Sequence, residues 1–197
     1  MLRSKAVWAI IVSHFCSNWS GYVLISWLPL YFVEGLGVDF SAVGVVTMIP
    51  AVASFLFLNI AGLITDKVIA AGHDLTFVRK LMQTIGFGGG AAVLAVVGYL
   101  ESVGWAIALM SLGNILGAFG LGGWGSNHMD IAPKHAGVLM GITNTAGTLP
   151  GIIGVFVSGL ILQWTGSWIL VFQVAAAINV FGLVFYLLFA QTEKEFD

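Results

Sequence analysis

Long apolar stretches separated by short polar segments dominate the sequence. Runs without a single Asp, Glu, Lys or Arg extend over residues 6–33, 40–65, 81–100, 102–129 and 135–192. Each run exceeds the roughly 18 residues that mark a membrane-spanning helix. The last run is long enough for two helices, which a polar turn at 163–168 separates. The pattern predicts six transmembrane helices, at about 7–33, 42–65, 80–100, 104–128, 136–162 and 168–190.

The composition agrees with a membrane protein and excludes several other classes. Of 197 residues, 59% are hydrophobic and 8% are charged, whereas soluble domains carry roughly 25% charged residues. A soluble enzyme, a nucleic-acid-binding protein and a disordered chain are therefore excluded. The runs are also too long and too evenly apolar for the strands of an outer-membrane barrel. We expect an all-α membrane protein in which residues 1–197 form one six-helix bundle within the lipid bilayer.

The basic residues define the orientation of the predicted helices. All seven fall in segments on the side of the termini: Arg3, Lys5, Lys67, Arg79, Lys80, Lys134 and Lys194. The opposite loops carry only Glu34, Asp39 and Glu101. By the positive-inside rule, both termini face the cytoplasm or its topological equivalent. The charges leave open whether the membrane is that of a plastid, a lysosome or vesicle, or the cell.

Residue patterns typical of catalysis or cofactor binding are not found. Cys16 is the only cysteine, so no disulfide framework is expected. His128 and Asp130 are two possible metal ligands, but no third or fourth ligand lies near them in the sequence. A phosphate-binding GxxxxGK loop is also missing. We therefore predict no catalytic residue, no metal site and no cofactor.

Polar residues recur on one face of the first predicted helix. His14, Asn18 and Tyr22 follow one another at four-residue steps, so they share a face. Asn144 adds a polar position to the fifth helix. Polar groups inside a membrane mark either a solute cavity or hydrogen bonds between helices. We favour the cavity for the set as a whole and take these four residues as its candidates.

Glycine is dense in the fourth and fifth predicted helices. Three Gly-xxx-Gly pairs occur, at 113/117, 137/141 and 147/151. Such pairs let two helix backbones approach closely. They fit either static packing or helices that slide past each other during a transport cycle.

Two polar clusters lie at helix ends on the basic side. The first is a candidate gate, in which Asp66 would pair with Arg79 or accept hydrogen bonds from a helix N-terminus; its residues are Gly62, Asp66, Lys67, Arg79 and Lys80. The alternative for this cluster is a solvated loop with orienting charges. The second is a candidate helix-end network with Asp130 near Lys134; its residues are Asn127, His128, Asp130 and Lys134. That network would have either a structural role or a role in gating.

These motifs resemble a known family. Residues 62–67 are similar to the G-x-x-x-D-[RK] loop motif of the major facilitator superfamily. Residues 8–15, 18–19 and 28–31 resemble helix seven of its anion–cation symporter family, of the sialin, vesicular glutamate and plastid phosphate transporter type. Residues 127–133 and 137–148 resemble the segments around helices ten and eleven. The resemblance implies the C-terminal half, helices seven to twelve, of a twelve-helix fold.

The resemblance also implies a function and a partner. It indicates secondary active transport of a small organic or inorganic anion, of the phosphate or carboxylate type, by alternating access coupled to H⁺ or Na⁺. The partner would be the N-terminal six-helix half. Ser17 stands where vesicular glutamate transporters carry arginine, which argues against glutamate as the substrate. Two alternatives stay open: a stand-alone six-helix protein that pairs with itself to form a pore, and a membrane scaffold without transport activity.

Overall fold

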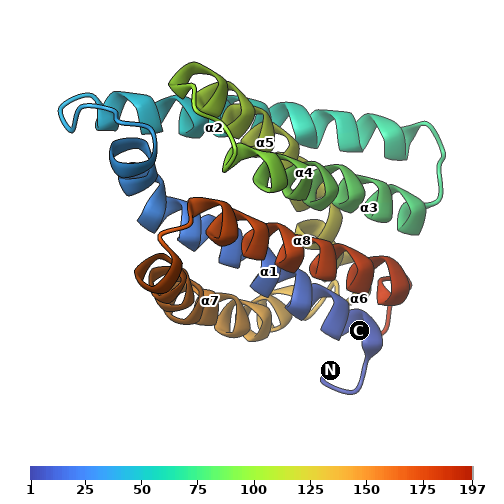
Figure 1. Ribbon diagram of the computed structural model, residues 1–197. Coiled ribbons are helices and arrows are strands. Elements are labelled where there is room, and N and C mark those ends of the chain that lie inside the picture. The colour runs from blue at the N-terminus through green and yellow to red at the C-terminus, as the bar shows by residue number, and fades with distance from the viewer. Residues whose placement is uncertain (197) are drawn as a thin grey trace.

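Helices that follow one another with short turns make up the fold (Figure 1). The computed structural model describes residues 1–196, and no strand occurs among them. The elements are α1 (Lys5–Leu30), η1 (Tyr31–Gly35), α2 (Val43–Ala70), α3 (Leu75–Gln83), η2 (Thr84–Gly88), α4 (Gly89–Val97), α5 (Val103–Gly120), η3 (Leu121–Gly125), α6 (Ser126–Ile131), α7 (Ala136–Thr165) and α8 (Trp168–Phe189). The elements η1, η2 and η3 are π-helical and continue the helix before them without a turn.

The observed helices follow the predicted ones, with shifted ends. The second helix continues from 65 to Ala70, and the third begins at Leu75 instead of residue 80. Asp74 caps that start, because its carboxylate accepts the backbone N–H of Phe77 at 2.8 Å. Hydropathy detects the apolar part of a helix, whereas backbone hydrogen bonding extends into the polar flanks. The second and third helices therefore extend beyond the predicted spans on the basic side.

Five helical segments are long and apolar enough to cross a membrane. They are Val43–Ala70, Leu75–Val97, Val103–Ile131, Ala136–Thr165 and Trp168–Phe189. The first helix, α1, is not among these five. Its His14, Ser17 and Asn18 lower its hydropathy, although its 26 residues reach about 39 Å at 1.5 Å per residue. The prediction of six spans is therefore confirmed for five segments and stays a prediction for α1.

The helices pack in two groups that α4 joins. α1 packs along α7 and α8, whereas α2 packs along α5. α4 contacts both α5 and α8 and so joins the two groups. Figure 1 shows α1, α7 and α8 on one side, α2, α4 and α5 on the other, and both termini at the same end.

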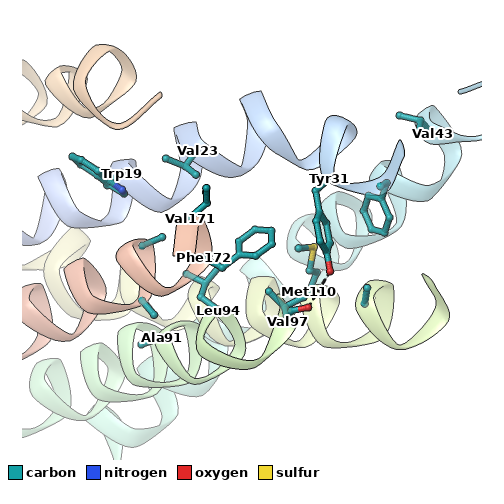
Figure 2. Close-up of a cluster of buried hydrophobic side chains, with 14 residues drawn as sticks. Trp19, Val23, Tyr31, Val43, Ala91, Leu94, Val97, Met110, Val171 and Phe172 are labelled. Carbon is teal, nitrogen blue, oxygen red and sulfur yellow. Dashed lines mark hydrogen bonds between the residues drawn. The ribbon is translucent and has the colours of Figure 1, made fainter. Parts of the chain in front are cut away.

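Aromatic and branched side chains fill the interior at the end of the bundle opposite the termini (Figure 2). Phe172 of α8 and Tyr31 of η1 are 2% exposed, and their rings meet edge to face at 4.9 Å. The Tyr31 hydroxyl donates to the carbonyl of Val97 at 3.0 Å. This bond satisfies a polar group that has no water available. Outward-facing side chains are apolar as well: Phe55 of α2 is 72% exposed and Ile152 of α7 is 74% exposed. The bundle thus presents an apolar surface suited to lipid.

Candidate functional site

The four cavity candidates lie along or beside the line where α1 packs on α7. We call this line the α1–α7 seam; it consists of His14, Asn18 and Tyr22 from α1 and Thr143, Gly147 and Gly151 from α7. The Asn18 amide donates to the carbonyl of Gly147 at 2.7 Å. A Cβ atom on Gly151 would lie only 3.3 Å from the Tyr22 ring. The seam is thus close-packed where the helix α7 carries glycine.

The four cavity candidates differ in how deeply their side chains are buried. His14 is buried, whereas Asn18 and Tyr22 are half-buried. Asn144 lies on the exposed side of α7, one position away from the buried Thr143. The structure therefore shows hydrogen bonds between helices for His14 and Asn18, and it separates Asn144 from them. Participation of these residues in a solute cavity stays a prediction.

Thr143 connects two histidines from different helices. Its hydroxyl oxygen lies 3.1 Å from Nδ1 of His14 in α1 and 2.9 Å from Nε2 of His128 in α6. It also lies 3.2 Å from the carbonyl oxygen of Met140. All three side chains are buried, and Trp124 covers them, with its ring centroid 4.5 Å from that of His14 and 6.1 Å from that of His128.

The number of protons decides the direction of these bonds. A hydroxyl donates one hydrogen bond and accepts two, and a carbonyl only accepts. Nδ1 of His128 faces the carbonyl of Gly125 at 3.1 Å, so Nδ1 carries a proton when this bond forms. A neutral His128 then has a bare Nε2, which accepts the Thr143 proton. If the hydroxyl instead donates to Met140 or His14, both His128 nitrogens donate, and the ring is a cation. One added proton on His128 therefore reverses the bond to Thr143.

Arg79 of α3 and Asp130 of α6 form an ion pair at the end of the bundle that carries the termini. Nε and Nη2 of Arg79 donate to the two carboxylate oxygens at 2.7 and 3.1 Å. Nη1 donates to the carbonyl of Gly122 in η3 at 2.9 Å. Each side chain is only 10% exposed. A paired guanidinium in two-point contact with a carboxylate fixes both distance and angle. The pair thus ties α3 to the η3–α6 segment.

At this end Arg79 binds Asp130 and not Asp66, which was one of the two arrangements that the gate prediction allowed. Asp130 correspondingly pairs with Arg79 rather than with its sequence neighbour Lys134, which is exposed. Charge and helix ends could be identified from the sequence, but Arg79 and Asp130 are 51 positions apart. Only the packing of α3 on η3 brings them together.

Three of the five gate residues nevertheless line one cavity. The elements α5, η3 and α6 form one continuous rod, which we call the α5–α6 rod. A cavity of about 260 Å³ lies between α2, α3 and this rod. It is lined by Gly62, Asp66 and Arg79, with Thr65, Gly122, Ser126 and four apolar side chains. Lys67 is exposed in the last turn of α2, and Lys80 is half-buried in α3. The cavity is partly open to the surroundings.

Asn127 completes the helix-end network. Its amide donates to the Tyr186 hydroxyl of α8 at 3.0 Å, and both residues are buried. Its carbonyl oxygen Oδ1 is buried without a hydrogen-bond partner among the described residues. His128 and Asp130 follow on the same short helix, so side-chain hydrogen bonds from its six residues tie α6 to α3, α7 and α8.

Several polar residues of the site were not predicted from the sequence. Thr143 and Gln83 are fully buried; the Gln83 amide contacts Ser13 Oγ at 3.4 Å, and its oxygen accepts the Trp124 backbone N–H at 3.3 Å. The buried residues of α7 recur at steps of three or four, and four of them are glycine, serine or threonine; they are Leu139, Thr143, Gly147, Pro150, Gly154 and Ser158. This spacing was the available signal for Thr143. Within residues 1–196, no group of three or more His, Cys, Asp or Glu gathers around a metal-sized space.

Comparison with known proteins places the chain in a family. The family model described as Major Facilitator Superfamily matches residues 1–155. The chloroplastic ascorbate transporter of Arabidopsis thaliana is 40% identical over 197 residues, which cover 100% of this chain and 36% of that protein. The chloroplastic sodium-dependent phosphate transport protein 1 of the same plant is 38% identical over 197 residues, 100% of this chain and 38% of that protein. Sialin of Homo sapiens is 38% identical over 199 residues, 99% of this chain and 40% of that protein.

These relatives are named as transporters or as sialin, and the chain spans less than half the length of each. The predicted resemblance to sialin and the plastid phosphate transporters is therefore confirmed. Together with the five apolar helices, the matches identify an integral, multi-pass membrane protein that is not an enzyme. The chain belongs to the major facilitator superfamily.

Proposed function

We propose that this chain is the C-terminal six-helix half of a secondary active transporter for a phosphate- or carboxylate-type anion. The observation that carries the proposal is the collinear match of the whole chain to plastid proteins named for ascorbate and phosphate transport. In this proposal α1 also crosses the membrane and brings the number of spans to six. The N-terminal half is the missing partner, and the solute lies between the halves near the midplane. The two halves rock about the solute by alternating access.

His14, Asn18, Tyr22 and Asn144 are the proposed contribution of this half to the solute cavity. Asn18 is half-buried, and its amide donates across the α1–α7 seam. Asn144 is exposed on α7, where an amide can donate to a carboxylate or phosphate oxygen. Because the seam is close-packed, we propose that the solute contacts its outer edge, at Tyr22 and Asn144. His14 lies behind this edge and would not contact the solute directly.

The proposed gate lies on the side of the termini. Gly62, Asp66 and Arg79 line one cavity, and Asp130 holds the Arg79 side chain in place by an ion pair. Lys67 and Lys80 flank it, and Asn127, His128 and Lys134 belong to the adjoining helix-end network. When a gate opens, such a cavity must change shape. The ion pair beside it has two discrete states, formed or broken, and so can distinguish the closed gate from the open one.

The proposed coupling ion is H⁺ or Na⁺, and the Thr143 hydrogen bonds support H⁺. Gain of one proton by His128 reverses the bond to Thr143 and thereby alters the link between α6 and α7. His128 lies two residues from Asp130. A proton bound at His128 is thus placed to act on the gate through the same short helix.

Uptake by the complete transporter tests this function. The chain is joined to its N-terminal half, reconstituted in vesicles and supplied with labelled phosphate or ascorbate under an imposed pH or Na⁺ gradient. The expected result is saturable uptake that one gradient drives and that dissipation of this gradient abolishes. Flux that is neither saturable nor gradient-dependent would contradict a carrier. Equal flux through vesicles that hold this chain alone would favour the self-paired pore, and no uptake in any pairing would favour the scaffold.

A further inference from the structure

A groove lies where the N-terminal segment meets the end of α8. It has a volume of about 240 Å³ and is lined by Leu2, Arg3, Lys5, Trp8, Phe185 and Phe189. The indole N–H of Trp8 donates to the carbonyl of Leu2 at 2.9 Å and so folds the N-terminal segment against α1. Lys5 Nζ lies 5.8 Å from the centre of the Phe189 ring. The groove thus has two cations at its mouth and aromatic rings along its wall.

The charges of this groove are all of one sign. Arg3 and Lys5 are both exposed, and neither forms an ion pair within residues 1–196. No acidic side chain lines the groove. A groove of this kind attracts an anion. The two cations also belong to the set of seven basic residues on one side of the bundle, where Lys and Arg meet lipid headgroups.

An aromatic track leads from the groove down the outside of α8. Phe189, Phe185 and Phe181 follow at four-residue steps, with ring centres 4.7 and 6.1 Å apart. Phe181 is 58% exposed and Trp8 is 45% exposed. An apolar track that begins under two cations at a helix end has the polarity of a phospholipid, with a place for a phosphate above and for an acyl chain below.

We propose that this groove binds one anionic phospholipid, with its phosphate on Arg3 and Lys5 and one acyl chain along Phe189, Phe185 and Phe181. The site does not depend on the proposed transport function. It requires only that the chain lies in a bilayer. By holding together the first turn of α1 and the last turn of α8, the lipid closes the bundle at the end that carries the termini.

Native mass spectrometry of the 197-residue chain in detergent tests the site, with phosphatidylglycerol and phosphatidylcholine as probes. We expect stronger retention of phosphatidylglycerol. Each cation in such a surface is worth about 1 kcal/mol, so R3Q/K5Q should weaken its binding by about thirtyfold and either single variant by about fivefold. F185A/F189A should weaken the binding of both lipids, because both carry acyl chains.

The matched control is K67Q/K134Q, which removes two exposed cations from the same side but outside the groove. It should retain phosphatidylglycerol nearly as the parent chain does. Equal losses in R3Q/K5Q and K67Q/K134Q would overturn the proposal in favour of general surface attraction. Equal retention of both lipids by the parent chain would overturn it in favour of an uncharged or protein occupant, and displacement by inorganic phosphate would overturn it in favour of a soluble anion.

Discussion

Gly147 sets how closely α1 and α7 approach. A Cβ atom at this position would lie 2.6 Å from Cδ2 and 2.9 Å from Nε2 of His14, and 3.0 Å from the Asn18 amide nitrogen. These atoms belong to side chains that hydrogen-bond across the seam, so they cannot move away without cost. Glycine is thus required here by space.

Gly147→Ala should therefore destabilise the protein, whereas Gly141→Ala should not. Overpacking of this kind costs about 1–3 kcal/mol. Gly141 lies on the same helix with nothing within 4 Å of an added Cβ. The free energy of unfolding of its alanine variant should therefore lie within about 0.5 kcal/mol of the parent value. Thermal unfolding in detergent compares the two. Equal losses would mean that the seam is looser than the structure shows.

Asp130→Asn should cost far more stability than Asp66→Asn. Removing one partner of a buried ion pair leaves the other charge uncompensated, at about 3–5 kcal/mol. Arg79 is only 10% exposed and would keep only neutral acceptors, the Gly122 carbonyl and one amide oxygen at position 130. Asp66 is exposed and lies outside this pair. Denaturation of both variants in the same detergent measures the difference, and a larger loss in Asp66→Asn would favour a pairing of Asp66 with Arg79 instead.

Thr143→Val should disconnect the two histidines while keeping the shape of the side chain. His14 Nδ1 and His128 Nε2 would both lose their common partner, and each unpaired buried group costs about 1–3 kcal/mol. Thr143→Ser keeps the hydroxyl and serves as the control. Thermal unfolding compares the two variants, and the unfolding temperature of the serine variant should stay close to that of the parent. If the valine variant also kept the parent's unfolding temperature, water would have replaced the hydroxyl.

Which of these residues could be predicted depends on how far apart the interacting groups are in the sequence. His14, Asn18 and Tyr22 follow helical spacing within one helix, so their common face was predictable from the sequence alone. The partner of Arg79 was not, because charge alone does not discriminate between Asp66 and Asp130. Thr143 was missed because the neighbouring Asn144 is the more polar residue, and polarity does not report which side of α7 faces α1.

At the scale of the elements, the π-helical segment η1 ends a helical rod, and η2 and η3 each interrupt one. Each of these two interrupting segments packs on the rod that contains the other. η2 packs on α5, and η3 packs on α3. Both segments are rich in glycine: η2 contains Gly86 and Gly88, and η3 contains Gly122, Gly123 and Gly125. A π-turn widens the helix and frees backbone groups locally. The sequence showed the glycine density and the apolar lengths, but the π-turns depend on helix contacts that no local pattern encodes.

Gly86→Ala should push the α3–η2–α4 rod away from α5. A Cβ atom there would lie 2.6 Å from the backbone nitrogen and 2.9 Å from Cα of Gly120. Backbone atoms cannot rotate away as a side chain can, so we expect a loss of at least about 3 kcal/mol, at the upper end for overpacking. Gly117→Ala on α5 meets open space and is the control. Folded yield and unfolding temperature measure both, and unchanged values for Gly86→Ala would contradict the close crossing.

At the scale of the whole molecule, the distribution of charge and the arrangement of the helices agree. The seven basic residues lie in segments that the sequence placed on one side, and Figure 1 shows the two termini at one end of the bundle. The order of five apolar helices could be predicted because hydropathy acts on each segment alone, whereas the sixth span and the orientation stay predictions. The grouping of α1 with α7 and of α2 with α5 could not, because apolar helix faces look alike in sequence, and small residues and polar contacts decide which faces meet.

The orientation leads to a test by chemical labelling. The α5–α6 rod is the only helical rod between Glu101 and Lys134, so cysteines placed at these two positions should react with a membrane-impermeant maleimide from opposite sides. Leu2→Cys and Lys134→Cys should react from the same side, because an even number of rods lies between them. The native Cys16 is only 1% exposed and adds little background. A permeant maleimide controls for reactivity. Labelling of Glu101→Cys and Lys134→Cys from one side would contradict a membrane-crossing α5–α6 rod, whereas labelling of Leu2→Cys and Lys134→Cys from opposite sides would contradict six spans and leave α1 outside the membrane.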